Sequence, residues 1–519
     1  MPSVVEDPQS YNPNYTAVTY DMLTQGVMGN HSGYYVAIGM VLVCIWLFQP
    51  SKPKCNVSAP LYKSSRMKWM FNADSLIRDS YTQFRDCVYQ IKATEGMRTI
   101  IPANLVGELK GLPESTLSAE TAVSEAMLSE YTQLSAGAHS DTLTLLLKTK
   151  TTQNLARMTP KLKEELEYIL STEFPACGDW TPFKIQPFMV RTVSRLSGRT
   201  FVGPALCRTE EWMDVSINFA ITAFIAVIKL QFFPPWMRPA AQYLVSELTT
   251  IRKDLEKAQA MLKPLIEERT PDSDTDGYEK PDDFMQWLLD AMPDEQKSDY
   301  FIQAKIQLLL SASSIHTTSN LTTDCIYDLA VHQDIQEILR EEASEVLENG
   351  NDWDKKETMP RLKKMDSFIK ESLRLSGNVT SFIRKVMKPI DLSDGTHLPP
   401  GTDLLTPLAG VAVDERFYPE PEKFDGLRFW KLRQQSEEAR DRWQFTSIGD
   451  TNMNFGLGKH ACPGRFFAAN EVKLILAHLL LNYDIKLKDG EGRPKPNMFM
   501  MTKSPSQTAE VLFRRRTNT

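Results

Sequence analysis

The chain has 519 residues, 42% of them hydrophobic and 24% charged, a composition that is ordinary for a folded globular protein. Its net charge of −7, with no basic stripe interleaved with aromatic residues, argues against a nucleic-acid-binding protein. The seven cysteines are scattered and form no disulfide framework, which predicts a reducing compartment for the body of the protein. No Gly/Ser-rich linker or repeat divides the chain, so one large, mostly helical domain is expected.

The first predicted element is a membrane anchor, from Tyr34 to Phe48. This run is uncharged and apolar, and a helix of its length covers roughly 22 Å, short of a hydrocarbon core of about 30 Å, so flanking residues have to help it span. A buried core helix or a signal-peptide segment is the alternative. A signal peptide is disfavoured because residues 1–33 contain no Lys or Arg, whereas Lys and Arg residues follow the run.

The charge distribution predicts a single-pass topology. Because Lys and Arg are retained on the cytosolic side, the body of the protein is expected in the cytosol and the N-terminus in the lumen. The chain then divides into a lumenal segment (1–33), the anchor (34–48), a connecting segment with the start of the body (49–105) and the main domain (106–519). Asn14 and Asn30 in the lumenal segment are candidate N-glycosylation sites.

A long helix is predicted from Lys305 to His332, and its middle is rich in hydroxyls. Ser and Thr in a helix can bond back to the i−4 carbonyl and bend the helix. Thr317 and Thr318 are therefore either functional hydroxyls or side chains bonded back onto their own helix. His316 can relay protons near neutral pH, or it can be a bystander held by a neighbouring group.

Two further segments carry charged candidates. Glu371 and Arg374 lie three residues apart on one face of a predicted helix, a pair that is ordinarily exposed and of small energetic value. Residues 379–401 are predicted as strand, turn and strand. Arg384, in the first strand, is a further charged candidate, with Lys385 or a solvated strand charge as the alternatives.

Near the C-terminus, Phe455-Gly-Leu-Gly-Lys-His-Ala-Cys-Pro-Gly464 places Cys462 before a predicted helix, 466–480. Gly456 and Gly458 can adopt positive φ and let the backbone approach a flat ligand closely. The helix start favours a thiolate, which is a strong ligand for haem iron. His460 is placed to donate to a haem propionate, and Phe455 to shield the sulfur. A buried structural cysteine is the alternative; a phosphate-binding loop and a zinc site both fail on spacing.

The loop matches the haem-binding signature of the cytochrome P450 family, Phe-Gly-x-Gly-x-His-x-Cys-x-Gly, at every fixed position. The segments around Glu371, around Arg428 and from Ser313 to Thr318 also resemble motifs of that family. The resemblance covers most of the chain from about Val106 to Leu512. Within the family, the Ile-His-Thr-Thr sequence at 315–318 resembles a fungal subgroup that includes ent-kaurene oxidases and related terpenoid hydroxylases.

The resemblance implies a mainly α (α+β) fold of the P450 type, with a helical bulk, a small β-rich subdomain and an N-terminal transmembrane helix. It implies a haem b whose iron is ligated by Cys462 and whose propionates meet His460 and Arg384. Thr317 would assist oxygen activation, with His316 standing where the family usually has an acid. Glu371, Arg374 and Arg428 would form a buried structural network.

The function so implied is a monooxygenase in the endoplasmic reticulum membrane that oxidises a hydrophobic secondary metabolite, a terpenoid of the diterpenoid, meroterpenoid or indole-diterpene kind. Electrons would come from NADPH-cytochrome P450 reductase, because the chain has no flavin or nicotinamide fingerprint. An alkaloid or polyketide substrate, a haem-thiolate isomerase and a haem-binding protein are the alternatives. The candidate reductase contacts are Lys363, Lys364, Lys459 and Arg465; the candidate substrate-facing residues are Leu309, Ala312, Ser313, Val379, Phe382 and Met498–Met501.

Overall fold

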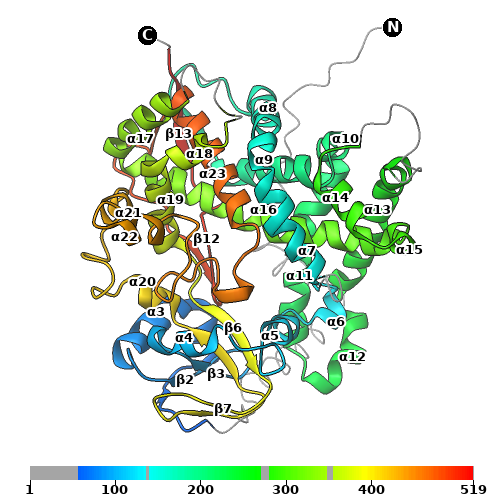
Figure 1. Cartoon of the computed structure of the whole chain (residues 1–519), viewed down its shortest axis with the longest axis vertical. Helices are drawn as coiled ribbons and strands as arrows, with labels where there is room; N and C mark the ends of the chain where they lie inside the picture. The colour runs from blue at the N-terminus through cyan, green and yellow to red at the C-terminus, as the bar shows by residue number, and fades with distance from the viewer. Residues whose placement is uncertain (1–56, 136–139, 270–279, 348–352, 354, 518–519) are drawn as a thin grey trace, which may run out of the picture.

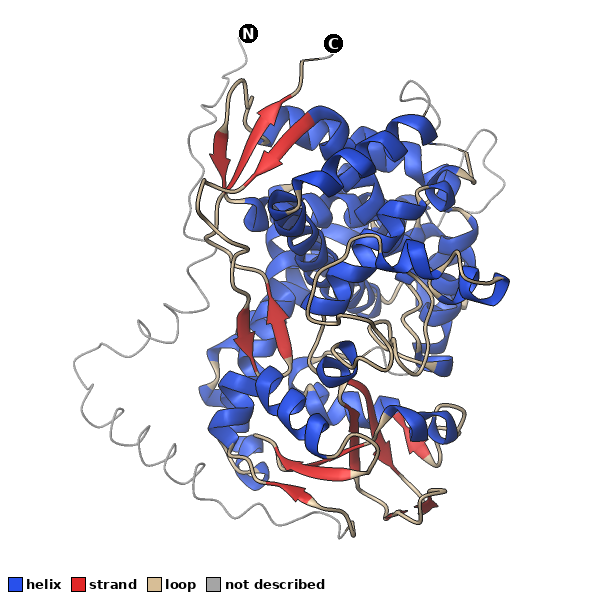
Figure 2. Ribbon diagram, turned by 90° about the vertical axis from the view of Figure 1, so that its left-hand side faces the viewer, coloured by secondary structure: helices blue, strands red, loops and turns tan. Residues whose placement is uncertain are grey.

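The structure is a computed structural model, and it describes residues 57–135, 140–269, 280–347, 353 and 355–517. The predicted anchor at 34–48 and the candidate glycosylation sites Asn14 and Asn30 lie outside these residues. Helices make up most of the protein, and a smaller part that contains most of the strands lies at its lower end in Figures 1 and 2. This agrees with the mainly helical architecture expected from the sequence.

The helix α16 (Tyr300–Val331) runs through the middle of the helical part (Figure 1). It begins five residues before the predicted start because Asp299 caps it, accepting a hydrogen bond from the Ile302 N–H at 3.0 Å. Most of its side chains are buried, as expected of a helix surrounded by others. It packs against α9 (Ile185–Phe201), α11 (Glu210–Gln231), α13 (Ser246–Arg269), α19 (Lys363–Ser376) and α23 (Arg465–Asn482).

In the described part of the chain, five further helices have eight residues or more: α3 (Arg66–Gln83), α5 (Ala119–Ala126), α8 (Leu155–Glu173), α14 (Phe284–Ala291) and α17 (Gln333–Val346). The shorter ones are α4 (Val106–Leu109), α6 (Ser129–Thr132), α7 (Ser140–Leu146), α10 (Pro204–Cys207), α12 (Arg238–Ala241), α15 (Asp294–Lys297), α18 (Thr358–Arg361), α20 (Leu408–Ala412), α21 (Arg428–Leu432) and α22 (Glu437–Arg442).

A six-stranded sheet has the order β1-β2-β3-β9-β6-β4. Its strands are β1 (Leu61–Tyr62), β2 (Tyr89–Lys92), β3 (Met97–Ile100), β4 (Leu117–Ser118), β6 (Ser381–Val386) and β9 (Asp403–Thr406). The first three strands come from the predicted connecting segment, so that segment and residues 381–406 build one sheet. The smaller sheets pair β7 (Ile390–Asp391) with β8 (His397–Leu398), β11 (Asn497–Phe499) with β12 (Thr502–Ser504), and β10 (Tyr483–Lys486) with β13 (Val511–Arg515) and β5 (Thr181–Phe183).

Two hydrophobic clusters determine where the cysteine loop sits. The larger one fills the helical part and includes much of α23, the helix that follows Cys462. A second cluster packs side chains of the sheet region, such as Phe382 and Leu404, against Met453 and Leu457 of the cysteine loop. The loop is therefore held between the helical core on one side and the sheet on the other.

Among the described residues, one helix, α11, is long and apolar enough to cross a membrane by length and composition. Half of its apolar window is buried, and it packs against α9, α13 and α16. These contacts identify α11 as a helix of the protein body.

Candidate functional site

The backbone of the cysteine loop has the two positive-φ glycines that the sequence predicted. Gly456 has φ = 72° and Gly458 has φ = 67°. A side chain at Gly458 would come within 2.6 Å of the carbonyl oxygen of Lys110, and one at Gly456 within 3.1 Å of that of His460. The loop is closed by a hydrogen bond from the Cys462 N–H to the Phe455 carbonyl, 2.7 Å long. Glycine is therefore required at both positions by conformation and by space.

The thiol of Cys462 lies at the start of α23, where the sequence placed it. The backbone N–H groups of Gly464 and Arg465 donate to its sulfur. Burial raises the pKa of the Cys462 thiol, while these two N–H groups and the nearby Arg465 charge lower it by less. The helix start thus favours the thiolate, as expected. In the protein alone, burial outweighs this effect and the thiol form is favoured. A bound cation is what makes a buried thiolate stable.

Phe455 and His460 both precede Cys462 in the sequence, and each has its own contacts in the structure. The Phe455 ring packs edge-on against Phe445, with centroids 5.2 Å apart. Nε2 of the His460 ring lies 2.5 Å from the Glu114 carboxylate and donates a hydrogen bond to it. Burial and the positive charge of Arg384 lower the pKa of His460, and Glu114 opposes them.

Arg384 lies on β6, which is attached to the cysteine loop through a hydrogen bond from Ser381 Oγ to the Met453 carbonyl at 2.7 Å. A β-bulge between Ser381 and Arg384 includes Phe382, whose φ is +51°. The Arg384 guanidinium lies 4.2 Å above the Phe382 ring and donates to the Ile383 carbonyl. It is buried, which lowers its pKa to about 10, and it forms no ion pair with any carboxylate of the described residues. A buried, unpaired guanidinium of this kind suits an anionic ligand group.

The structure brings Glu371, Arg374 and Arg428 together in the interior. Glu371 is fully buried and accepts two hydrogen bonds from Arg374, both 2.8 Å, and two from Nε of Arg428, at 3.0 and 3.2 Å. The remaining donors of the two arginines go to backbone carbonyls, those of Ala412 and Pro421 for Arg374 and those of Pro419, Glu420 and Lys423 for Arg428. The network joins α19 to α21 and the loop before it.

The hydroxyl-rich part of α16 remains an unbroken helix. Thr317 is exposed, and its hydroxyl donates back to the Ser313 carbonyl at 2.8 Å; Ser313, one turn earlier, is exposed as well. Thr318 is buried, so the two threonines lie on different faces. His316 turns to a neighbouring helix, where Nε2 donates to the Ile217 carbonyl of α11 at 2.9 Å. The sequence left open whether His316 relays protons or is held by a neighbouring group, and in this structure the ring is held by the Ile217 carbonyl.

A small pocket lies between α3, the end of α11 and the β11–β12 hairpin. It is lined by Met70, Thr94, Ile228, Gln231, Phe232, Phe499 and Met500. Two of these belong to the predicted substrate-facing stretch Met498–Met501. Val379 and Phe382, which were also predicted to face a substrate, are 0% and 3% exposed and lie within the core clusters.

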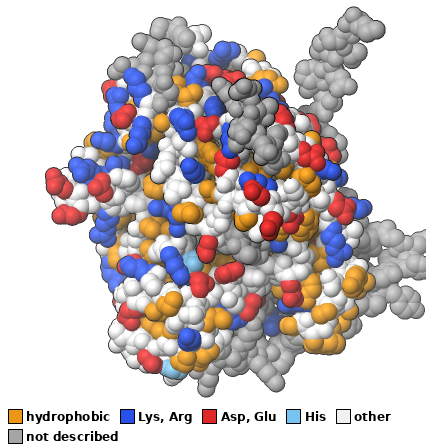
Figure 3. All heavy atoms as spheres, turned by 45° about the vertical axis from the view of Figure 1, so that its right-hand side comes forward, with side chains coloured by type: hydrophobic (Ala, Val, Ile, Leu, Met, Phe, Trp, Pro, Cys, Tyr) orange, Lys and Arg blue, Asp and Glu red, His pale blue; other side chains and the backbone are white. Residues whose placement is uncertain are grey.

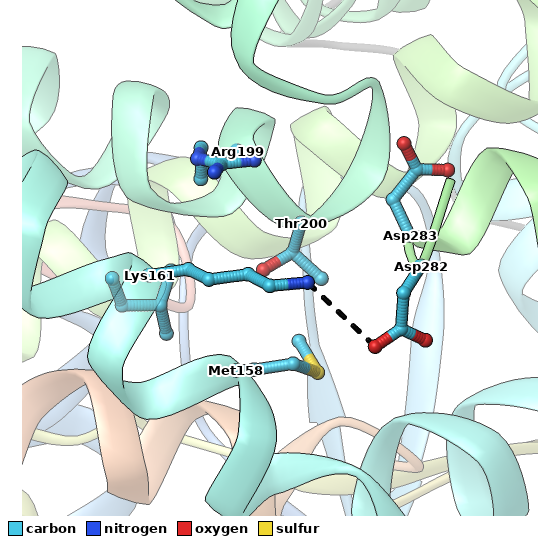
Figure 4. A pocket seen from close by; sticks show the side chains of 7 residues that line it. Met158, Lys161, Arg199, Thr200, Asp282 and Asp283 are labelled. Atoms are coloured by element: carbon cyan, nitrogen blue, oxygen red, sulfur yellow. Dashed lines mark ion pairs between the residues drawn. The ribbon is translucent and has the colours of Figure 1, made fainter. Parts of the chain in front are cut away.

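A second small pocket lies among α8, α9 and the start of α14 (Figure 4). Its polar rim contains the ion pair between Lys161 Nζ and Asp282 Oδ2, 3.6 Å apart. None of the residues that the sequence singled out for chemistry lines it.

The comparisons with known proteins decide the family. The sequence profile described as Cytochrome P450 matches residues 133–513. The chain belongs to the cytochrome P450 family. Cytochrome P450 monooxygenase AN1598 of Emericella nidulans is 36% identical over 85% of this chain and 83% of its own length. The ent-kaurene oxidase of Gibberella intermedia is 32% identical over 94% of each chain.

The P450 fold is also found by structural comparison. A structure titled "Retinoic acid bound cyanobacterial CYP120A1" aligns with a TM-score of 0.65, covering 86% of this chain and 95% of that chain at 18% identity. The protein is therefore a cytochrome P450 monooxygenase with a cysteine-ligated haem. The residues present fit that group, since the chain provides a positive-φ glycine loop, a sulfur that accepts backbone N–H groups and a buried unpaired guanidinium.

Sequence reasoning missed several residues of this P450. Glu114, the partner of His460, lies some 350 positions upstream in an unremarkable loop, so no local pattern marks it. Asp283, just before α14, is another such residue: it is buried and paired with Arg269 at 2.6 and 2.9 Å. The Asp-x-x-Gln spacing at 283–286 is typical of a helix N-cap and was the available signal for Asp283.

Proposed function

We propose that this P450 hydroxylates a hydrophobic secondary metabolite, a terpenoid, at a haem whose iron is ligated by Cys462. The observation that carries the ligand assignment is the cysteine loop itself. Cys462 is the cysteine that follows the two positive-φ glycines and accepts N–H groups at the start of α23. Haem with a thiolate ligand supplies oxygen activation when bound.

The residues around it have separate tasks in this proposal. Arg384 and His460 bind the propionates, and Arg384 is suited to this because it is buried without a carboxylate partner. Thr317 presents its hydroxyl from the exposed face of α16 and guides protons to the oxygen-binding side. His316 stays bound to Ile217 and supports the packing of α16 on α11. Glu371, Arg374 and Arg428 fix the core behind the cysteine loop.

A terpenoid substrate is supported by two observations. Two relatives that cover 94% of this chain are named ent-kaurene oxidases. The pocket beside the β11–β12 hairpin is lined mostly by apolar side chains, which suits a hydrophobic skeleton. No observation favours an alkaloid, a polyketide or a non-oxygenating reaction over this proposal.

The proposed setting is the cytosolic face of the endoplasmic reticulum, with NADPH-cytochrome P450 reductase as electron donor. The apolar run 34–48 and the Lys and Arg residues that follow it support an anchor. Hydrophobic side chains also gather at the lower end of the face shown in Figure 3. Near α12, Trp236, Tyr243 and Leu244 are 80%, 78% and 78% exposed, as expected of residues that touch a bilayer.

The first test is the carbon-monoxide difference spectrum of the reduced protein in microsomes, beside Cys462→Ser. A Soret band near 450 nm that disappears in the variant supports thiolate ligation by Cys462; a band that the variant keeps refutes it. Feeding terpenoid hydrocarbons to the microsomes with reductase and NADPH then tests the substrate class. Reductase-dependent oxidation of an alkaloid or polyketide, with no terpenoid product, would overturn the substrate assignment.

A further inference from the structure

Glu114 connects the cysteine loop to the segment before α5. Its Oε1 accepts a hydrogen bond from His460 Nε2 at 2.5 Å and forms an ion pair with Lys459 Nζ at 3.7 Å. Its Oε2 accepts hydrogen bonds from Ser118 Oγ at 2.7 Å and from the Ala119 N–H at 3.1 Å. One carboxylate thus joins two regions that are far apart in the chain.

The same carboxylate is held firmly on the α5 side. The N–H groups of Ala119 and Glu120, the first residues of α5, both point to it, at 3.1 and 3.4 Å from Oε2. An anion at a helix start is favourable because it satisfies unpaired N–H groups and the helix dipole. Burial raises the pKa of Glu114, but Ser118, His460 and these N–H groups outweigh it, so the pKa is lowered and the group is a carboxylate at neutral pH.

Two other contacts join this region to the cysteine loop. The Lys110 carbonyl packs against Gly458, and Lys110 Nζ lies 3.2 Å from Asp450 Oδ1. Lys148, from the turn after α7, donates to the Lys459 carbonyl at 3.1 Å. The backbone of the loop is thus located by several contacts, but the side chain of His460 has one polar partner among the described residues, Glu114.

We propose that Glu114 is a positioning residue for the haem, acting through His460. By engaging Nε2, Glu114 fixes the orientation of the imidazole. A contact between Nδ1 and a propionate then uses a second ring proton, because Glu114 and the propionate are both acceptors. A histidine without this partner would be free to rotate, since its side chain is 31% exposed. The inference rests on the proposed function, because it takes His460 as a propionate contact.

The test compares Glu114→Gln with Glu120→Gln in the haem-loaded, full-length protein. Glu120 is exposed, lies six residues away and loses the same charge, so it is a matched control. Two properties are measured: the rate at which haem transfers to an apo-globin acceptor, and the midpoint potential of the haem. We expect E114Q to lose haem several-fold faster and to shift the potential upward, because a negative charge close to the propionates is removed. E120Q should change neither.

A double-variant comparison separates positioning from helix capping. If Glu114 acts through His460, E114Q should add nothing to the haem-transfer rate of His460→Gln. An additional several-fold increase in the double variant would overturn the proposal, as would wild-type behaviour of E114Q alone.

Two further outcomes are distinguishable. If E114Q folds poorly, His460→Gln alone decides, since it removes the imidazole and keeps the contacts of Glu114 with Ser118 and the start of α5: faster haem transfer than in the wild type supports the proposal, and wild-type haem retention overturns it. If the wild-type protein shows no thiolate-ligated haem, the proposed function fails, whereas a normal wild-type spectrum with unchanged E114Q refutes only the role of Glu114.

Discussion

The imidazole of His316 donates from Nε2 to the backbone carbonyl of Ile217, 2.9 Å away on α11. This contact turns the ring toward a neighbouring helix although its sequence neighbour Thr317 is exposed. Burial lowers the pKa of His316, with the Ile217 carbonyl opposing the shift, so the ring is neutral near pH 7. A neutral imidazole whose N–H is already bound inside the protein is poorly placed to relay protons.

The first prediction contrasts His316 with Thr317. Thr317→Ala should release a several-fold larger share of NADPH electrons as hydrogen peroxide, because the exposed hydroxyl of α16 is removed. His316→Gln should keep the wild-type share, since an amide can donate to the Ile217 carbonyl. Peroxide and NADPH are measured with reductase and a compound that produces a high-spin spectral shift. Equal uncoupling by both variants would show that His316 takes part.

The second prediction concerns Glu371. Replacing it by Ala leaves the buried guanidinium groups of Arg374 and Arg428 without their carboxylate, which costs about 3–5 kcal/mol of folding stability. The haem content of purified protein should fall steeply. As a control, Glu167→Ala breaks a partly exposed i,i+4 pair with Lys163 and should change stability by less than about 0.5 kcal/mol. Urea denaturation of both variants checks this; comparable losses would contradict a structural role for the network.

The third prediction concerns Gly203, which has φ = 86° and ψ = 176°, a conformation that residues with a side chain rarely adopt. A Cβ there would lie 3.0 Å from Asp283 Oδ2 and 3.2 Å from Arg269 Nη2. Gly203→Ala should therefore destabilise the protein by about 1–3 kcal/mol. Gly107→Ala, in α4 with open space around it, should leave stability unchanged or slightly higher. A thermal midpoint for G203A equal to that of G107A would show that the Arg269–Asp283 pair tolerates the side chain.

The fourth prediction is a pH dependence caused by Glu471 on α23. This carboxyl is fully buried, and its one hydrogen bond, from Ser197 Oγ to Oε1, is 3.3 Å long, while Oε2 has no partner in the described part of the chain. Burial raises its pKa from 4.5 to about 8, with the Ser197 bond opposing the shift. Because the folded state holds this proton more tightly than the unfolded state, the group's contribution to stability is complete below pH 4.5 and is lost as the pH rises to 8.

That loss amounts to about 4–5 kcal/mol across the interval. Glu471→Gln cannot ionise, so its stability should fall less than that of the wild type between pH 6 and pH 9. Urea midpoints at the two pH values measure the difference. Parallel changes in the two proteins would mean that Glu471 is ionised in the folded state.

Much of the site could be predicted from local sequence. The cysteine loop is defined by glycines whose positive φ is a property of single residues, and Gly456 and Gly458 adopt it as expected. The helix after the cysteine and the long hydroxyl-rich helix follow from apolar periodicity. Their predicted starts differ from the observed ones by one to five residues, the larger difference arising because the cap Asp299 was not recognised. The resemblance to the P450 family lay in the residues of that loop and of the segments around Thr317, Glu371 and Arg428.

Tertiary structure decided what each side chain touches. No spacing rule links Glu114 to His460, or β6 to the cysteine loop through Ser381 and Met453, because these pairs meet only when distant segments pack. The direction of His316, the burial of Phe382 and the net pKa of Cys462 likewise depend on neighbours from other elements. The sequence by itself determined the backbone conformation of the haem loop and the residue types it presents, since those are local properties; partners, burial and electrostatics are properties of the packed chain.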